Sequence, residues 1–114
     1  MPVDVDPARF EELVGDALDG LPDEIAALLD NVVVVVAEGR DRGLLGLYEG
    51  TPRTERGQYG FMEMPDRVTV YRRPLCALAA DEDELVHEVR VTVAHELGHH
   101  LGIDDTRLHE LGFG

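Results

Sequence analysis

The sequence predicts an α+β fold in which helices pack on one small sheet. Three observations predict this class. Apolar residues recur at helical spacing near both ends of the chain, β-branched and alternating runs lie between them, and turn-forming residues separate the two kinds of segment. A chain of 114 residues suits a single domain, 1–114, with one modest core.

Two helices are expected before the first strand. Asp6 followed by Pro7 has the form of a helix cap followed by proline at the first helical position. Six apolar residues then recur at helical spacing and predict a helix over 7–20: Phe10, Leu13, Val14, Ala17, Leu18 and Leu21. Pro22 permits a second start, and a short helix should end near Asp30 and Asn31.

The middle of the chain predicts three strands. The run Val32–Val36 is β-branched throughout, so we expect a strand that is covered on both faces. Residues 44–49, LLGLYE, are a second candidate, and residues 67–73, RVTVYRR, alternate polar and apolar as a third. The stretch 50–65 is rich in turn-forming residues and predicts mainly a loop, with an extended part over 59–63.

A long helix is expected over 81–101. Acidic residues fill its first turn, where they favour the positive end of the helix dipole. Four apolar residues form an i, i+4 stripe for the core: Val89, Val93, Leu97 and Leu101. Gly102 stands where a left-handed cap ends a helix most easily. A last short helix, 105–111, should carry Leu108 and Leu111 back to the core.

The charge of the chain limits its partners. The net charge is −14, and the ten basic residues other than histidine are all arginines. Such an acidic surface repels phosphate backbones, so we expect no nucleic-acid partner. No apolar run is long enough to span a membrane and no signal peptide is visible, so a cytoplasmic protein is expected. Cys76, the single cysteine, lies in an apolar stretch and is expected in the core.

The stretch HELGHHLGIDD, residues 95–105, has the pattern of a metal site. On a helix, His95 and His99 lie about 40° apart, one turn above the other, so both imidazoles can reach one cation. Glu96 lies about 100° from His95, which suits a general base acting on a water molecule rather than a ligand. Zinc is the expected metal, held by three protein ligands with one position open.

The third ligand must come from beyond the helix. Gly102 can turn the chain back, and Asp105 would then face the two histidines. Asp104 is the alternative ligand, whereas His100 points about 140° from His95 and is excluded. A polar helix end with surface histidines is the alternative to a metal site.

Other polar residues are weaker candidates. Glu88 and Thr92 project on the same helical face as His95, where they could line a cleft or remain solvated. A tyrosine could donate its phenol to the oxyanion formed during hydrolysis, and the sequence does not choose among three of them: Tyr48, Tyr59 and Tyr71. His87 and His109 are expected at the surface.

The extended motif resembles that of the small bacterial zincin-like metallopeptidase family. LPDEI at 21–25, LYEG at 47–50, PDRVTVYRRPL at 65–75 and DDTRLHELGFG at 104–114 extend the resemblance over nearly the whole chain. It implies a minimal zincin fold, with a small twisted mixed sheet over the active-site helix. It also implies that His95, His99 and Asp105 bind zinc and that Glu96 is the catalytic base. No methionine follows the motif, so Phe113 is the candidate support beneath the site, or a plain core anchor.

The expected function is zinc-dependent hydrolysis of a peptide or protein substrate. So small a chain has no second subdomain to form a cleft, so the peptide should lie along an exposed strand edge. The alternatives are a non-catalytic metal-binding or protein-interaction module that keeps the fold, and a different metallohydrolase. Among the latter, rRNA-maturation endoribonucleases carry a third histidine where Asp105 stands, and peptide deformylases carry an upstream cysteine in a motif that Cys76 lacks. The exposed edge also makes a homodimer plausible.

Overall fold

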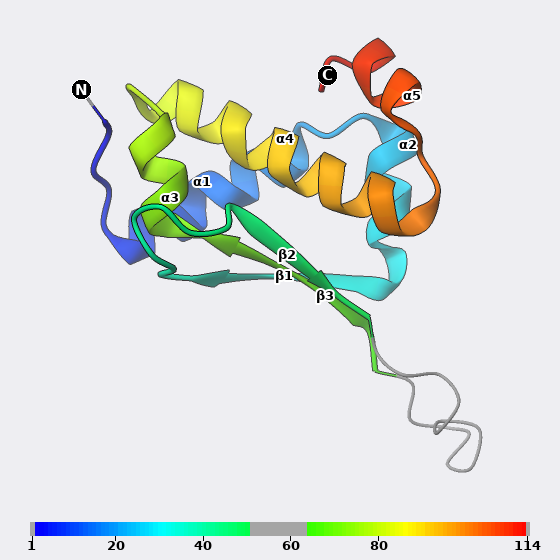
Figure 1. The fold of residues 1–114 in the computed structure, drawn as a ribbon, viewed down its shortest axis with the longest axis horizontal. Coiled ribbons are helices and arrows are strands. Elements are labelled where there is room, and N and C mark those ends of the chain that lie inside the picture. Colours follow the sequence, from blue (N-terminus) through cyan, green and yellow to red (C-terminus); the bar gives the residue numbers. More distant parts are fainter. Residues whose placement is uncertain (1, 51–63, 114) are drawn as a thin grey trace.

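The computed structural model describes residues 2–50 and 64–113, and its α+β fold agrees with the expectation from the sequence (Figure 1). The elements in chain order are α1 (Pro7–Asp19), α2 (Asp23–Ala26), the 3-10 helix η1 (Ala27–Asn31), β1 (Val32–Ala37), β2 (Gly46–Glu49), β3 (Asp66–Tyr71), α3 (Arg72–Leu78), α4 (Glu82–Leu101) and α5 (Asp105–Glu110). The extended stretch expected over 59–63 lies outside the described residues.

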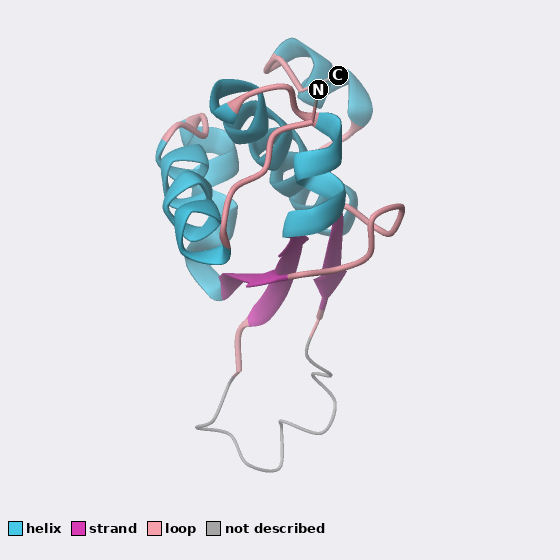
Figure 2. Ribbon diagram, turned by 90° about the vertical axis from the view of Figure 1, so that its left-hand side faces the viewer, coloured by secondary structure: helices cyan, strands magenta, loops and turns pink. Residues whose placement is uncertain are grey.

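The three strands form a small mixed sheet with the order β1-β3-β2. The central strand β3 pairs in parallel with β1 and antiparallel with β2, so that Val68 lies opposite both Val34 and Tyr48. Val68 and Val70 are fully buried, and the described helices lie on one side of the sheet (Figure 2). This arrangement makes β2 an edge strand, next to the long helix α4.

Strand β1 corrects one prediction. Its valines were expected to be covered on both faces, but burial alternates along the strand, and Val33 and Val35 are 43% and 36% exposed. The prediction was wrong because the described helices cover only one face of the sheet, and a β-branched run is equally compatible with a half-covered strand.

Helix α1 forms as its sequence predicts. The side chain of Asp6 accepts a hydrogen bond from the backbone N–H of Arg9 at 2.8 Å, which caps the first turn ahead of Pro7. Its buried face consists of Phe10, Leu13, Val14 and Ala17. At the other end, Arg90 of α4 donates from Nε to the carbonyl of Ala17 at 3.1 Å, which joins the two helices.

Helix α3 was not predicted. The third strand was expected to continue through Arg73, but it ends at Tyr71, and Arg72 begins a helix. Pro74 is tolerated because it lies in the first turn, where the backbone N–H has no helical partner. Cys76 is 6% exposed, as expected for a core residue, and burial raises the pKa of its thiol above the ordinary value.

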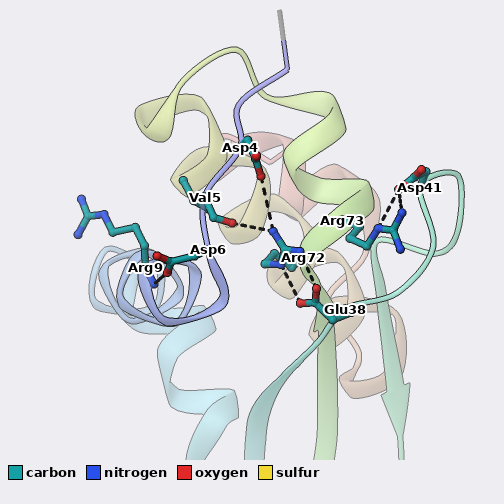
Figure 3. A network of polar contacts seen from close by, with 8 residues as sticks. All are labelled: Asp4, Val5, Asp6, Arg9, Glu38, Asp41, Arg72 and Arg73. Atoms are coloured by element: carbon teal, nitrogen blue, oxygen red, sulfur yellow. Dashed lines mark hydrogen bonds and ion pairs between the residues drawn. The ribbon is translucent and has the colours of Figure 1, made fainter.

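Arg72 stabilises the junction between β3 and α3 (Figure 3). Its guanidinium donates to both carboxylate oxygens of Glu38, which follows β1, and to the carbonyl of Val5 at 2.6 Å. The neighbouring Arg73 donates to Asp41 at 2.9 Å. These bonds attach the N-terminal segment and the loop after β1 to the start of α3.

Helix α4 runs through the core and carries the candidate site on its last turns. Asp81 caps its start by accepting from the N–H of Glu84 at 2.8 Å. The expected apolar stripe is buried as far as Leu97, but Leu101 is 38% exposed, because the helix leaves the core before its last residue. Among the described residues no helix combines the length and apolarity needed to cross a membrane.

Candidate metal centre

The end of α4 and the start of α5 bring the predicted ligands together. Gly102 ends α4 in the left-handed region, with φ 94°, and its N–H bonds the carbonyl of Gly98 at 3.0 Å. Ile103 donates to the same carbonyl, so the chain folds back closely over Gly98. A Cβ at Gly98 would lie 3.0 Å from the carbonyl oxygen of Ile103 and 3.0 Å from Leu108. Gly98, whose role no sequence pattern indicated, permits the tight return to Asp105.

Three side chains could hold one metal ion at this turn. His95, His99 and Asp105 each offer a ligand atom, and these atoms all lie within 4.8 Å of one another. Nε2 of His99 is 3.3 Å from Oδ1 of Asp105, and the rings of His95 and His99 meet edge to face with centroids 5.8 Å apart. Two imidazoles and one carboxylate are a donor set that zinc accepts in catalytic sites. The residues present therefore fit the metal.

Asp104 has a different role from Asp105. It is the cap of α5, and its carboxylate accepts from the backbone N–H of Arg107 at 2.8 Å. A side chain that bonds this N–H satisfies one of the unpaired donors at the helix start. Asp105, the next residue, is the first of the helix, and its side chain is 83% exposed. Of the two aspartates, Asp105 belongs to the three-residue cluster, whereas Asp104 caps the helix.

Phe113 contacts the site through its backbone as well as its ring. The side chain is 5% exposed, and its N–H bonds the carbonyl of Leu108 at 2.8 Å. Its own carbonyl accepts from Nε2 of His95. Metal-binding histidines commonly donate their second ring N–H to a carbonyl, which fixes the ring and the tautomer.

The side chain of Glu96 extends from α4 to the edge strand β2. Its Oε1 accepts a hydrogen bond from the backbone N–H of Tyr48 at 3.0 Å. The carboxylate is half-buried and is not a member of the three-residue cluster. Glu96 therefore lies next to the cluster and not in it.

A cleft lies beside Glu96, between β2 and α4. Its volume is about 310 Å³, and its lining residues are Leu45, Gly46, Val91, Thr92, His95 and Glu96. Of the two candidates on the face of His95, Thr92 lines this cleft, whereas Glu88 is half-buried outside it. The cleft therefore combines apolar side chains, Leu45 and Val91, with Thr92 and two residues of the motif.

The three tyrosines differ in what their side chains contact. The phenol of Tyr48 donates to the buried carboxylate of Asp66, and its ring stacks on His100 with centroids 4.4 Å apart. Tyr71 packs against Gly39, where an added Cβ would lie 2.7 Å from the Cβ of Tyr71. Tyr59 lies outside the described residues. The phenol of Tyr48 is therefore bonded to Asp66 and its ring stacks on His100. No sequence pattern indicated either contact.

Two features together characterise this protein. Its fold is α+β, and its longest described helix carries an H-E-x-x-H motif with a third candidate ligand beyond a glycine turn. The chain belongs to the zincin-like metallopeptidase family, whose model matches residues 29–114. The resemblance seen in the sequence is thus confirmed. No curated protein matches the chain.

Proposed function

We propose that this protein is a zinc-dependent peptidase in which His95, His99 and Asp105 would hold the metal and Glu96 is the general base. The observation that carries the proposal is the convergence of the three ligand atoms within 4.8 Å, next to Glu96 and the cleft beside β2. Membership of the family supports it. Bound zinc supplies Lewis acidity, which polarises the scissile carbonyl and lowers the pKa of a water molecule.

The peptide would lie along β2. This strand is at the edge of the sheet, and extended peptides commonly add a strand to such an edge. Backbone hydrogen bonds would fix the peptide, and one of its side chains would enter the cleft lined in part by Leu45 and Val91. A medium-sized apolar side chain fits about 310 Å³ with little cost in desolvation.

Glu96 moves the protons of the reaction. Its carboxylate takes a proton from the attacking water and delivers it to the nitrogen of the leaving amine, so that the peptide bond breaks with no net change in charge. Before a peptide binds, the hydrogen bond from Tyr48 holds this carboxylate at the strand edge where the peptide would lie. His95 is held in turn by the carbonyl of Phe113.

A peptide-library digestion with added zinc tests the proposal. Glu96→Gln keeps the size and hydrogen bonding of the side chain but removes the base, so cleavage should fall by about 100-fold or more. Glu88→Gln, a half-buried glutamate of the same helix outside the cleft, is the matched control and should cleave like the wild type.

Two results would contradict the proposal. Equal cleavage by the wild type and Glu96→Gln would remove Glu96 from the mechanism. Zinc binding by the wild type without cleavage of any library peptide would favour a non-catalytic module that keeps the fold.

A further inference from the structure

Asp105 is carried by a helix that cannot be stable alone. Helix α5 has six residues, and isolated helices of this length do not form in water. Its position must therefore come from contacts with the rest of the protein. Leu108 is fully buried and provides one such contact. A second long-range contact is polar, and it joins α5 to α2.

Arg107 and Glu24 form this polar contact. Nε of Arg107 lies 2.9 Å and 3.0 Å from the two carboxylate oxygens of Glu24, and Nη2 lies 2.5 Å from Oε1. The two residues are 83 positions apart in the chain. Both groups are charged near neutral pH, and the hydrogen bond between them lowers the pKa of Glu24 and raises that of Arg107. Figure 1 shows α5 next to the α2 end of the molecule.

The pair and the candidate ligand lie on opposite sides of α5. Arg107 follows Asp105 by two positions, which is a rotation of about 200° around a helix. One side of α5 thus faces Glu24, and the other side places Oδ1 of Asp105 at 3.3 Å from His99.

We infer that the Arg107–Glu24 ion pair is a positioning contact for the third metal ligand. It holds α5 where Asp105 reaches the two histidines, and it touches neither the metal nor the substrate. The inference rests on the proposed function only in taking Asp105 as a zinc ligand.

Whether zinc binding becomes weaker or tighter in a charge-reversal variant distinguishes a positioning role of Arg107 from a simple effect of its charge. Arg107→Glu makes the protein two charge units more negative, and long-range attraction alone would then tighten the binding of a divalent cation. Loss of position has the opposite effect, because Asp105 leaves the cluster when the introduced carboxylate repels Glu24. Weaker zinc binding by this variant is therefore not an electrostatic by-product.

A matched control pair exists elsewhere in the chain. Arg9 and Glu82 lie 2.7 Å apart and their side chains are 43% and 42% exposed, against 45% and 41% for Arg107 and Glu24. The control joins α1 to the first residue of α4, which is 13 positions, or about 20 Å along the helix, from His95. Arg9→Glu changes the net charge by the same amount, far from the cluster.

The experiment is a zinc titration of tag-free protein against a chromophoric chelator. Arg107→Glu and Glu24→Arg should each weaken zinc binding by about fivefold, at the upper end of what an exposed ion pair supplies. The double variant Glu24→Arg/Arg107→Glu restores the pair with reversed charges and keeps the net charge, so its affinity should return to within about twofold of the wild type. Arg9→Glu, which has the same net charge as Arg107→Glu, should bind zinc at least as tightly as the wild type.

Hydrogen exchange of the Leu108 amide, which bonds the carbonyl of Asp104, reports the position of α5 without metal. Exchange should be faster in Arg107→Glu and unchanged in Arg9→Glu. If Arg107→Glu does not fold, Arg107→Gln replaces it in both measurements.

Unchanged or tighter zinc binding by Arg107→Glu would overturn the inference. If the wild type binds no zinc, the proposed function fails instead. The hydrogen-exchange rate of the Leu108 amide alone then decides whether the pair positions α5. Equal exchange in the wild type and Arg107→Glu would then overturn it.

Discussion

Replacement of Gly46 by alanine tests how closely the edge strand must approach the helix of the candidate site. A Cβ at Gly46 would lie 2.6 Å from Cγ2 of Thr92, 3.2 Å from the carbonyl oxygen of Thr69 and 3.7 Å from Cγ of Glu96. Real Cβ atoms do not lie 2.6 Å from a neighbouring carbon, so either Thr92 leaves its rotamer or β2 and α4 move apart. The substitution therefore strains the contact next to Glu96.

The size of the effect follows from these distances. Ordinary contact begins at 3.4 Å, so the added methyl needs about 0.8 Å more space. Overpacking of this kind costs about 1–3 kcal/mol. Gly46 does not have a positive φ, so without the clash alanine would stabilise the protein by about 0.4–1 kcal/mol through the unfolded state. The sign of the measured change therefore identifies the cause.

Urea unfolding of three variants provides the assay. Gly46→Ala should lower the free energy of unfolding by about 1–2 kcal/mol. Thr92→Ser removes the Cγ2 methyl, so Gly46→Ala/Thr92→Ser should regain at least half of the loss. Gly15→Ala in α1 is the control, because an added Cβ there meets no atom within 4 Å, and it should gain about 1 kcal/mol in helix propensity. A Gly46→Ala variant as stable as the wild type would refute the reasoning.

Two further predictions concern the glycine turn and the buried thiol. Gly102→Ala should cost about 1–2 kcal/mol in thermal or urea unfolding, because φ is 94° at this position, and a cost near zero would mean that the turn relaxes without strain. Cys76 should react slowly with iodoacetamide at pH 8, followed by mass spectrometry, because burial raises the pKa of the thiol. Addition of urea should make labelling fast, and fast labelling of the folded protein would show that α3 opens.

The sequence was most informative where one local pattern determines the structure. The Asp6 and Pro7 pair predicted the start of α1, and Gly102 predicted the end of α4, because caps depend on neighbouring residues alone. Residues whose structure depends on distant partners were harder. Arg72 was expected in a strand, but in the structure it bonds Glu38 and begins α3, and no periodicity in RRPLCAL indicates a helix.

The candidate site shows the same division. The i, i+4 spacing of the histidines and the glycine turn were sufficient to predict that His95, His99 and Asp105 meet. The contacts that support them were not predictable, because each joins residues far apart in the chain. Examples are the bond from Tyr48 to Glu96 and that from Arg107 to Glu24, which depend on how β2 and α2 pack.

The hydrogen bond between Tyr48 and Glu96 has a consequence for substrate entry. A backbone N–H has one hydrogen to donate, and at Tyr48 the carboxylate of Glu96 now accepts it. A peptide that pairs with the outer edge of β2 at this residue competes for the same hydrogen. Binding of the peptide would release the carboxylate of Glu96 from the strand at the moment when a proton acceptor is needed. Without a peptide on β2, the same carboxylate would stay bonded to the N–H of Tyr48.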